Sequence, residues 1–215
     1  MRSSAFPTLL LTLCLSAAAL QAQTHQHHHP GADEASQEAQ CHDPAQTDEA
    51  TEAVKAPAFP DVELLDQRGR RVHFFSDLIQ GRTVAVQTIF TTCTTICPPM
   101  GAHFAKLQKK LGPDSEVQLI SVSIDPVTDR PSRLRAWQAR FGARGDNWTL
   151  VTGSKLEVDR LLRSLGLFSP DKVDHSPTIL VGNEASGQWT RTNGLADPDK
   201  LLEILAQLQE APSTR

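Results

Sequence analysis

Two cysteines four residues apart, Cys93 and Cys97, stand where an apolar, β-branched segment runs into a helix that begins with prolines. The segment Thr83–Phe90 is typical of a buried strand, and Pro98 and Pro99 suit the first turn of a helix. Residues at i and i+4 of a helical turn share a face, so both sulfur atoms can reach one soft metal ion or each other. A helix N-terminus lowers the pKa of a thiol, which favours the thiolate that binds metals and attacks disulfides. The pair indicates metal-binding or redox chemistry; the alternative is two buried small hydrophobic residues.

His175 is the second candidate for chemistry. It precedes an apolar segment, Thr178–Val181, on a loop that an α/β fold would bring near the cysteine turn. Asp125 ends another predicted strand and is either a charge that tunes the thiols or a turn-forming residue before proline. Met100 and His103 follow helical spacing, so they are predicted to be a core residue and a surface residue.

Strands and helices alternate along the part of the chain that must position these residues. Predicted strands cover residues 61–65, 71–74, 83–90, 116–124, 148–151, 178–181 and 188–192, and predicted helices cover 98–111, 130–141, 154–164 and 197–208. This order predicts an α/β sandwich in which helices flank a central mixed sheet, with an N-terminal β-hairpin as an extension. Functional residues of such folds gather at the carboxyl ends of strands, where the cysteines fall.

The first 56 residues have a different composition. Residues 1–22 combine Arg2, an apolar run and small residues before a cleavage site after Ala19 or Ala22. This pattern predicts a signal peptide, with an uncleaved membrane anchor as the alternative. Residues 23–56 are rich in His, Ala, Gln and acidic residues and contain no aromatic residue, which predicts a disordered linker. The folded domain is then expected to span residues 57–211.

Export would place the cysteines in an oxidising compartment, where a Cys93–Cys97 disulfide can persist. Cleavage of the leader would leave Cys41 as an odd thiol. His25–His29, together with Cys41 and His42, forms a tract that is either metal-binding or merely a solvated linker. The net charge of −4 gives no basic footprint for nucleic acid.

Three blocks of the sequence, in this order, resemble the Sco/SenC family. They are Phe90-Thr-Thr-Cys93-Thr-Thr-Ile-Cys97-Pro98, Ser121-Val-Ser-Ile-Asp125-Pro126-Val-Thr-Asp129 and Val173-Asp174-His175-Ser176. The family comprises thioredoxin-fold copper proteins of cytochrome c oxidase assembly, and the resemblance covers residues 57–210. It implies a thioredoxin-like fold in which Cys93, Cys97 and His175 bind copper as Cu(I) or Cu(II). The donor types agree, because soft thiolates select Cu(I) and an imidazole suits either copper state.

The resemblance also implies a biological role. It implies a metallochaperone that is exported to the periplasm. There the protein would be either soluble or tethered to the inner membrane through an uncleaved leader. Its expected partners are a cuproprotein acceptor, such as an oxidase subunit, and the thiol–disulfide reductants that keep the cysteine pair reduced. Oxidation of the pair would remove both thiolate ligands, so the pair would also act as a redox switch.

One departure from the family pattern supports an alternative hypothesis, in which the protein is an enzyme. Pro177-Thr178 looks like the cis-proline loop that faces the redox cysteines of thioredoxins. It favours a periplasmic thiol–disulfide reductase that uses Cys93 and Cys97 and does not need His175. Against this, such reductases mostly carry two residues between the cysteines, and this chain carries three. A thiol peroxidase is a third hypothesis, but the proline expected ahead of its motif is missing.

Overall fold

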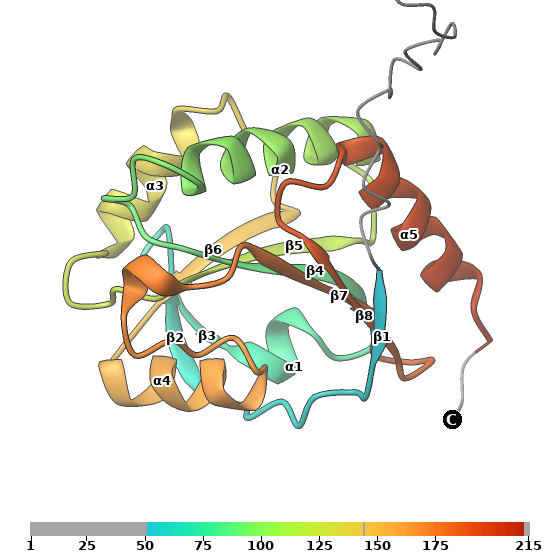
Figure 1. Cartoon of the computed structure of the whole chain (residues 1–215), viewed down its shortest axis with the longest axis horizontal. Coiled ribbons are helices and arrows are strands. Elements are labelled where there is room, and N and C mark those ends of the chain that lie inside the picture. The colour runs from blue at the N-terminus through green and yellow to red at the C-terminus, as the bar shows by residue number, and fades with distance from the viewer. Residues whose placement is uncertain (1–50, 144, 213–215) are drawn as a thin grey trace, which may run out of the picture. The chain divides into compact units, whose positions relative to one another are not determined.

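The computed structural model of the chain describes residues 51–143 and 145–212. Within them, eight strands form one sheet in the order β1-β8-β7-β4-β5-β6-β2-β3 (Figure 1). The strands are β1 (Glu52–Val54), β2 (Glu63–Asp66), β3 (Arg71–His73), β4 (Thr83–Ile89), β5 (Gln118–Ser123), β6 (Trp148–Thr152), β7 (Thr178–Asn183) and β8 (Gln188–Asn193). The helices are α1 (Phe74–Leu78), α2 (Cys97–Leu111), α3 (Pro131–Ala139), α4 (Lys155–Ser164) and α5 (Pro198–Glu210), with a short 3-10 helix η1 at Lys172–Asp174.

The centre of the sheet is mixed, as the sequence predicts. β4 and β5 run parallel, as do β5 and β6, whereas β7 is antiparallel to β4 and β8 is antiparallel to β7. The carboxyl ends of β4, β5, β6 and β8 therefore lie at the same end of the sheet as the amino end of β7. We call this the carboxyl end of the sheet. The predicted N-terminal hairpin is confirmed: β2 and β3 are antiparallel, and β2 joins the sheet beside β6.

Helices cover both faces of the sheet because successive strand residues point to opposite sides. Ala85 and Ile89 of β4 belong to a core cluster that includes residues of α2, α3 and α5. Val84 and Val86 belong to a second cluster that includes residues of α1 and α4. Figure 1 shows α2 and α5 on one side of the sheet and α1 and α4 on the other. The central strand β4 is buried along its whole length, so it is a rigid support for the turn that follows it.

Local signals explain the helix limits next to the site. Pro98 and Pro99 occupy the first turn of α2, and the helix ends at Gly112, whose φ of 80° is unfavourable for other residues. The Ser154 hydroxyl accepts a hydrogen bond from the Glu157 N–H and caps α4. Both helices therefore begin within one residue of the predicted position.

The sequence prediction was wrong at β1. Glu52–Val54 lies in the segment 23–56 that composition predicts to be linker, yet it pairs with β8, with Glu52 opposite Arg191. The edge of β8 supplies backbone partners whatever the side chains are, so composition does not reveal this strand. The predicted leader, Cys41 and the histidine tract lie outside the described residues. Among the residues that the structure describes, no helix is long and apolar enough to cross a membrane.

Candidate metal-binding and redox site

The cysteine turn connects the end of β4 to the start of α2. The Cys93 N–H donates to the carbonyl of Phe90 at 3.1 Å, which closes the turn, and Cys97 is the first residue of the helix. Both cysteines are free thiols and both are buried, with 7% of Cys93 and none of Cys97 exposed. The Cys97 N–H donates to the Cys93 sulfur at 3.4 Å, so the Cys93 Sγ lies at the amino terminus of α2.

The two thiols are electrostatically different. Burial raises the pKa of Cys93, but hydrogen bonds from Cys97 and Thr95 outweigh it and bring the pKa below its ordinary value. Burial also raises the pKa of Cys97, which reaches about 12 because the neighbouring Cys93 adds to the effect. Only part of the sequence expectation is therefore met: the helix N-terminus favours the thiolate of Cys93, whereas burial dominates at Cys97. Such a pair has one nucleophilic thiol and one thiol that stays protonated at neutral pH.

Asp129 holds the cysteine turn in place, a role that the sequence does not reveal. Its buried carboxylate accepts hydrogen bonds from the Thr91 N–H at 3.0 Å, from the Thr91 hydroxyl and from the Ser123 hydroxyl at 2.7 Å. These bonds join the loop after β5 to the start of the turn after β4. The sequence shows Asp129 as a second acidic residue four positions after Asp125, but this spacing does not reveal that its partner is Thr91.

His175 lies at the same end of the sheet, just before β7. Its Nδ1 is 2.7 Å from the carbonyl of Lys172, and because a carbonyl only accepts, this bond places the ring proton on Nδ1. The other nitrogen, Nε2, is buried and has no hydrogen-bond partner within the described part of the chain. Its lone pair is therefore available, and a metal-binding imidazole commonly has this arrangement, with the second nitrogen bonded to a carbonyl.

Asp125 and Lys172 connect the loops around the cysteine turn. The Lys172 ammonium is 2.6 Å from a carboxylate oxygen of Asp125 and lies 5.5 Å from the centre of the Phe90 ring. Burial raises the pKa of Asp125, but hydrogen bonds from Lys172 and Thr128 bring it below its ordinary value, so the carboxylate is charged. Asp125 thus contacts the loop that carries His175. Its ion pair and hydrogen bonds go to Lys172 and Thr128 rather than to the thiols.

The ring of Phe90 links the two halves of the site. It meets the His175 ring edge to face with 5.5 Å between the ring centres, and it shares a core cluster with both cysteines. No three His, Cys, Asp or Glu side chains converge tightly enough to hold a metal ion within residues 51–143 and 145–212. Two thiols and an imidazole with a free lone pair are nevertheless the donor types of a soft metal site. Binding by all three would require their side chains to move closer together than they lie in this structure.

The remaining predicted residues have other roles. All peptide bonds of the described residues are trans, so Pro177-Thr178 does not form the cis-proline loop that its sequence suggests. The Pro177 carbonyl instead accepts a hydrogen bond from the Gly194 N–H, which holds the loop after β8. Met100 is fully buried, as predicted. His103, predicted to be a surface residue, is half-buried, with Nδ1 3.2 Å from the Ala196 carbonyl.

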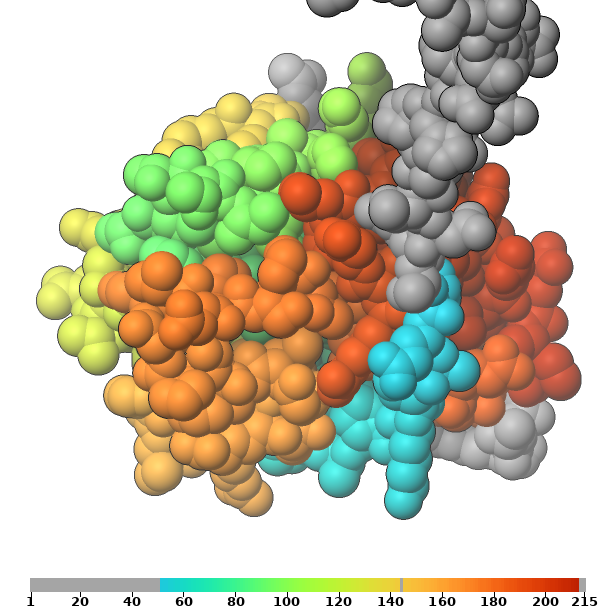
Figure 2. All heavy atoms as spheres, viewed as in Figure 1, coloured from blue at the N-terminus to red at the C-terminus, as the bar shows by residue number. Residues whose placement is uncertain are grey.

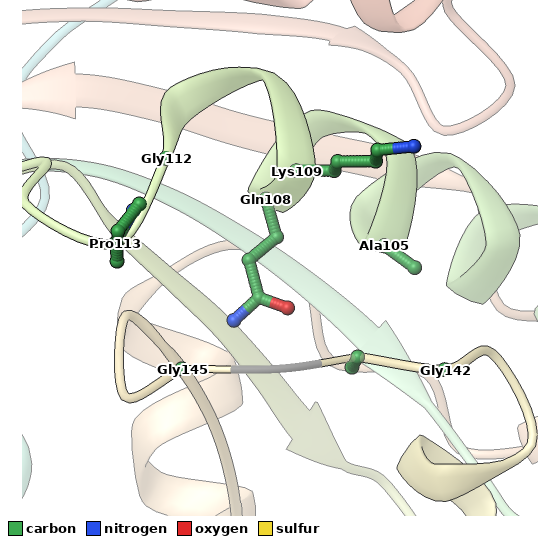
Figure 3. A pocket seen from close by; sticks show the side chains of 8 residues that line it. Ala105, Gln108, Lys109, Gly112, Pro113, Gly142 and Gly145 are labelled. Carbon is green, nitrogen blue, oxygen red and sulfur yellow. The ribbon is translucent and has the colours of Figure 1, made fainter.

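A hollow of about 550 Å³ lies far from this chemistry (Figure 3). It is lined by Ala105, Gln108, Lys109, Gly112, Pro113, Gly142, Ala143 and Gly145. These residues flank the carboxyl terminus of α2, whereas Cys97 begins that helix. The hollow is therefore separate from the candidate site.

The fold and the site define a thioredoxin-like protein that carries a cysteine pair and a histidine loop at the carboxyl end of its sheet. The family model of SCO1/SenC matches residues 50–210, which is more than half of the chain. The chain therefore belongs to the SCO1/SenC family.

Individual relatives agree with this assignment. The SCO1 protein homolog of Bacillus subtilis (strain 168) is 39% identical over 111 residues, covering 49% of this chain and 56% of the relative. The chain thus spans little more than half the length of that relative. The solved structure of BsSco, a member of the Sco family of cytochrome c oxidase assembly proteins in which a disulfide switch was identified, is 29% identical with a TM-score of 0.59. The matched region covers 72% of this chain and 96% of BsSco.

A copper-bound structure shows the same fold. Arabidopsis thaliana ScoI with copper bound has a TM-score of 0.58 and is 21% identical, over 74% of this chain and 99% of ScoI. At this identity the likeness supports the thioredoxin-like fold and nothing finer.

Proposed function

We propose that this protein is an exported metallochaperone that carries copper at Cys93, Cys97 and His175 and delivers it to a cuproprotein such as cytochrome c oxidase. One observation carries the proposal: the Nε2 atom of His175 is buried without a hydrogen-bond partner among the described residues, at the end of the sheet that bears two free thiols. A buried polar atom without a partner is costly, so the unpaired Nε2 of His175 supports a metal ion as its partner in the copper-loaded protein.

The donor set supports copper as the cargo. Thiolates are the ligands that select Cu(I), and an imidazole suits both copper oxidation states. A structural zinc site would usually have four protein ligands, and three are proposed here. Membership of the SCO1/SenC family points to the same metal.

The cysteine pair is proposed to switch copper binding on and off. The Cys93 thiolate attacks a sulfur of a partner protein's disulfide, which forms a mixed disulfide and releases one partner thiolate. Cys97 then loses its proton and displaces the second partner thiolate, so the pair is oxidised and the partner is reduced. Oxidation removes both sulfur ligands, and a thiol–disulfide reductant reverses the step. The disulfide switch in BsSco supports this part of the proposal.

Location and boundaries complete the proposal. The composition of residues 1–22 and 23–56 supports an export signal or membrane anchor followed by a linker, ahead of a folded domain that the sequence places at 57–211. The protein would then act in the periplasm, either soluble or tethered to the inner membrane. β1 extends the folded part to Glu52.

A thiol–disulfide reductase is the second candidate function. The observation that favours it is the asymmetry of the thiols, with a Cys93 pKa below its ordinary value and a Cys97 pKa of about 12. This asymmetry is what a nucleophilic and a resolving cysteine require. His175 distinguishes the two functions, because the metallochaperone needs it as a copper ligand and a reductase does not need it.

Copper titration of the reduced protein tests the proposal. We expect one tightly bound Cu(I), lost in Cys93→Ser and weakened at least about tenfold in His175→Ala, a factor that corresponds to about 1.4 kcal/mol. His103→Ala is the matched control, because His103 is half-buried on α2 and is not a proposed ligand. Binding that is indifferent to His175 would contradict the three-ligand site, and a reductase assay on the same variants would then decide for the second function.

A further inference from the structure

Large hydrophobic side chains are exposed at four positions of the described residues. They are Val127, Leu156, Val173 and Leu195, with exposures of 76%, 75%, 74% and 38%. Single exposed hydrophobic residues are normal, and only their clustering carries information. All four lie in or next to a connection at the carboxyl end of the sheet, and Val127 and Val173 lie nearest to β4 in the strand order.

The strand directions establish this placement. Val127 follows β5, and Leu156 is in the first turn of α4 after β6; both strands are parallel to β4. Val173 precedes β7, which is antiparallel to β4, and Leu195 follows β8, where Asn193 is opposite Thr178. These are the connections at the end where the cysteine turn leaves β4.

Val127 and Val173 flank the cysteine turn. β5 and β7 are the two neighbours of β4, and adjacent strands lie about 4.8 Å apart. The loops that carry Val127 and Val173 are therefore the immediate neighbours of the turn that carries Cys93. In Figure 1 the green turn after β4, the yellow-green loop after β5 and the orange loop before β7 gather on the left. In Figure 2 the orange surface adjoins the green surface there.

Ile96 adds apolar surface at the centre of this arrangement. It is half-buried between the two cysteines in sequence and packs against the core with its remaining surface. The loops on either side are fixed by the Asp125–Lys172 ion pair and by the bonds of Asp129 to Thr91. The exposed valines are thus held on anchored loops, which lowers the entropy that an interface would otherwise lose on binding.

The charge next to Val173 is acidic. Asp171 and Asp174 are both exposed on either side of it, and the Asp171 carboxylate accepts the Val173 N–H at 2.9 Å. The intervening Lys172 is paired with Asp125, so its charge is locally balanced. A partner surface with lysine or arginine at its rim would complement these two carboxylates.

We propose that Ile96, Val127 and Val173 form a docking face for the protein that receives the metal. This docking face fits one kind of occupant: a protein whose metal-accepting side chains are surrounded by apolar residues and by a basic rim. Docking there would bring the acceptor's ligands over the cysteine turn. The inference rests on the proposed function, since it assumes that Cys93, Cys97 and His175 carry the metal.

Copper-transfer kinetics of the full chain test the docking face. The probe acceptor is the purified copper-receiving domain of a cytochrome c oxidase subunit, and a small Cu(I) chelator, bathocuproine disulfonate, serves as an acceptor that needs no docking. We expect the double variant Val127→Ser, Val173→Ser to lower the second-order rate to the protein acceptor at least about tenfold. Its copper affinity and its rate to the chelator should stay within about twofold of wild type.

Leu156→Ser is the matched control, because Leu156 is equally exposed at the same end but follows β6, two strands from β4. It should leave both rates unchanged. Asp171→Asn with Asp174→Asn should slow transfer to the protein acceptor and flatten its dependence on salt, because long-range attraction is screened by salt.

Three outcomes would overturn the inference. The first is a transfer rate to the protein acceptor that is unchanged in the double valine variant. The second is an equal loss in Leu156→Ser. The third is a dimer of the wild type that the double variant converts to monomer, which would make a second copy the occupant. A protein that binds no copper would instead contradict the proposed function, and this result is measured separately by the titration.

Discussion

The Lys172 ammonium lies 2.6 Å from a carboxylate oxygen of Asp125, and this ion pair joins the loop that carries His175 to the loop after β5. The Lys172 carbonyl also accepts the hydrogen bond of His175 Nδ1. One residue therefore anchors the loop through its side chain and orients the imidazole through its backbone. Because the Lys172 side chain is 43% exposed, the pair itself stabilises the fold by only about 0–1 kcal/mol. Its effect should be on the position of His175.

Replacing Lys172 by glutamine tests this role. We expect Lys172→Gln to lower Cu(I) affinity by roughly threefold to tenfold, while the free energy of unfolding changes by less than about 1 kcal/mol. A double-mutant cycle with His175→Ala separates positioning from general loosening, because the effect of Lys172→Gln should vanish once the histidine is absent. An effect of the same size in both backgrounds would show that Lys172 acts independently of His175.

The unequal thiols predict unequal alkylation of the reduced, metal-free protein. The Cys93 pKa lies below its ordinary value, so its thiolate forms at lower pH than that of an exposed cysteine. The Cys97 pKa of about 12, compared with 9.0 for an unperturbed thiol, leaves roughly 10³ times less thiolate near neutral pH. Iodoacetamide should therefore label Cys93 first at pH 7, and Cys97 labelling should rise only as the pH approaches 12.

Mass spectrometry of the alkylated peptides checks this order of reaction. Cys93→Ser and Cys97→Ser supply the single-thiol controls, since each leaves one reactive group to titrate. Preferential labelling of Cys97 at pH 7 would contradict the arrangement at the start of α2.

The local parts of the site could be predicted from the sequence because short-range signals encode them. The β-branched run of β4 and the prolines after Cys97 define a strand, a turn and a helix start within one short stretch. Alternation of strands and helices then places Cys93 and His175 at the same end of the sheet. The fold class and the N-terminal hairpin were accordingly predicted correctly.

The remainder of the site depends on contacts between residues that are distant in sequence. Asp125 and Lys172 are separated by 47 positions, and Asp129 and Thr91 by 38. The raised pKa of Cys97 follows from tertiary burial, which the helix-terminus argument does not contain. These contacts arise only when the strands are assembled, so residue types and spacing do not specify them.

Asp129 should be required for the shape of the cysteine turn. Its carboxylate is fully buried and accepts bonds from the Thr91 N–H, the Thr91 hydroxyl and the Ser123 hydroxyl. Asp129→Ala leaves these donors unpaired, which should cost about 1–3 kcal/mol of unfolding free energy. The loosened turn should also speed alkylation of Cys97.

Urea unfolding and the alkylation assay measure the two effects together. Thr92→Ala is the control, because Thr92 is exposed in the same turn. A variant that is destabilised while Cys97 remains protected would assign Asp129 to the stability of the loop after β5 alone.

Asp66 should make the hairpin between β2 and β3 sensitive to acid. Its buried carboxylate accepts the N–H groups of Arg68 and Arg70 at 2.8 Å and the Arg70 Nε–H at 2.7 Å. Burial raises the pKa of Asp66, but these hydrogen bonds outweigh it, so the folded pKa lies below the unfolded one. The stabilisation is therefore complete above the unfolded pKa and is lost as the pH falls through the folded pKa.

Asp66→Asn should therefore cost about 1–3 kcal/mol of unfolding free energy at pH 7, and the difference from wild type should shrink as the pH falls below about 4. Urea unfolding followed by tryptophan fluorescence at pH 7 and pH 3 measures both values. Asp114→Asn is the control, because Asp114 is exposed in the loop before β5 and should change stability little at either pH. A difference that stays constant between the two pH values would mean that asparagine acts through lost packing, since only the ionised carboxylate makes the stabilisation depend on pH.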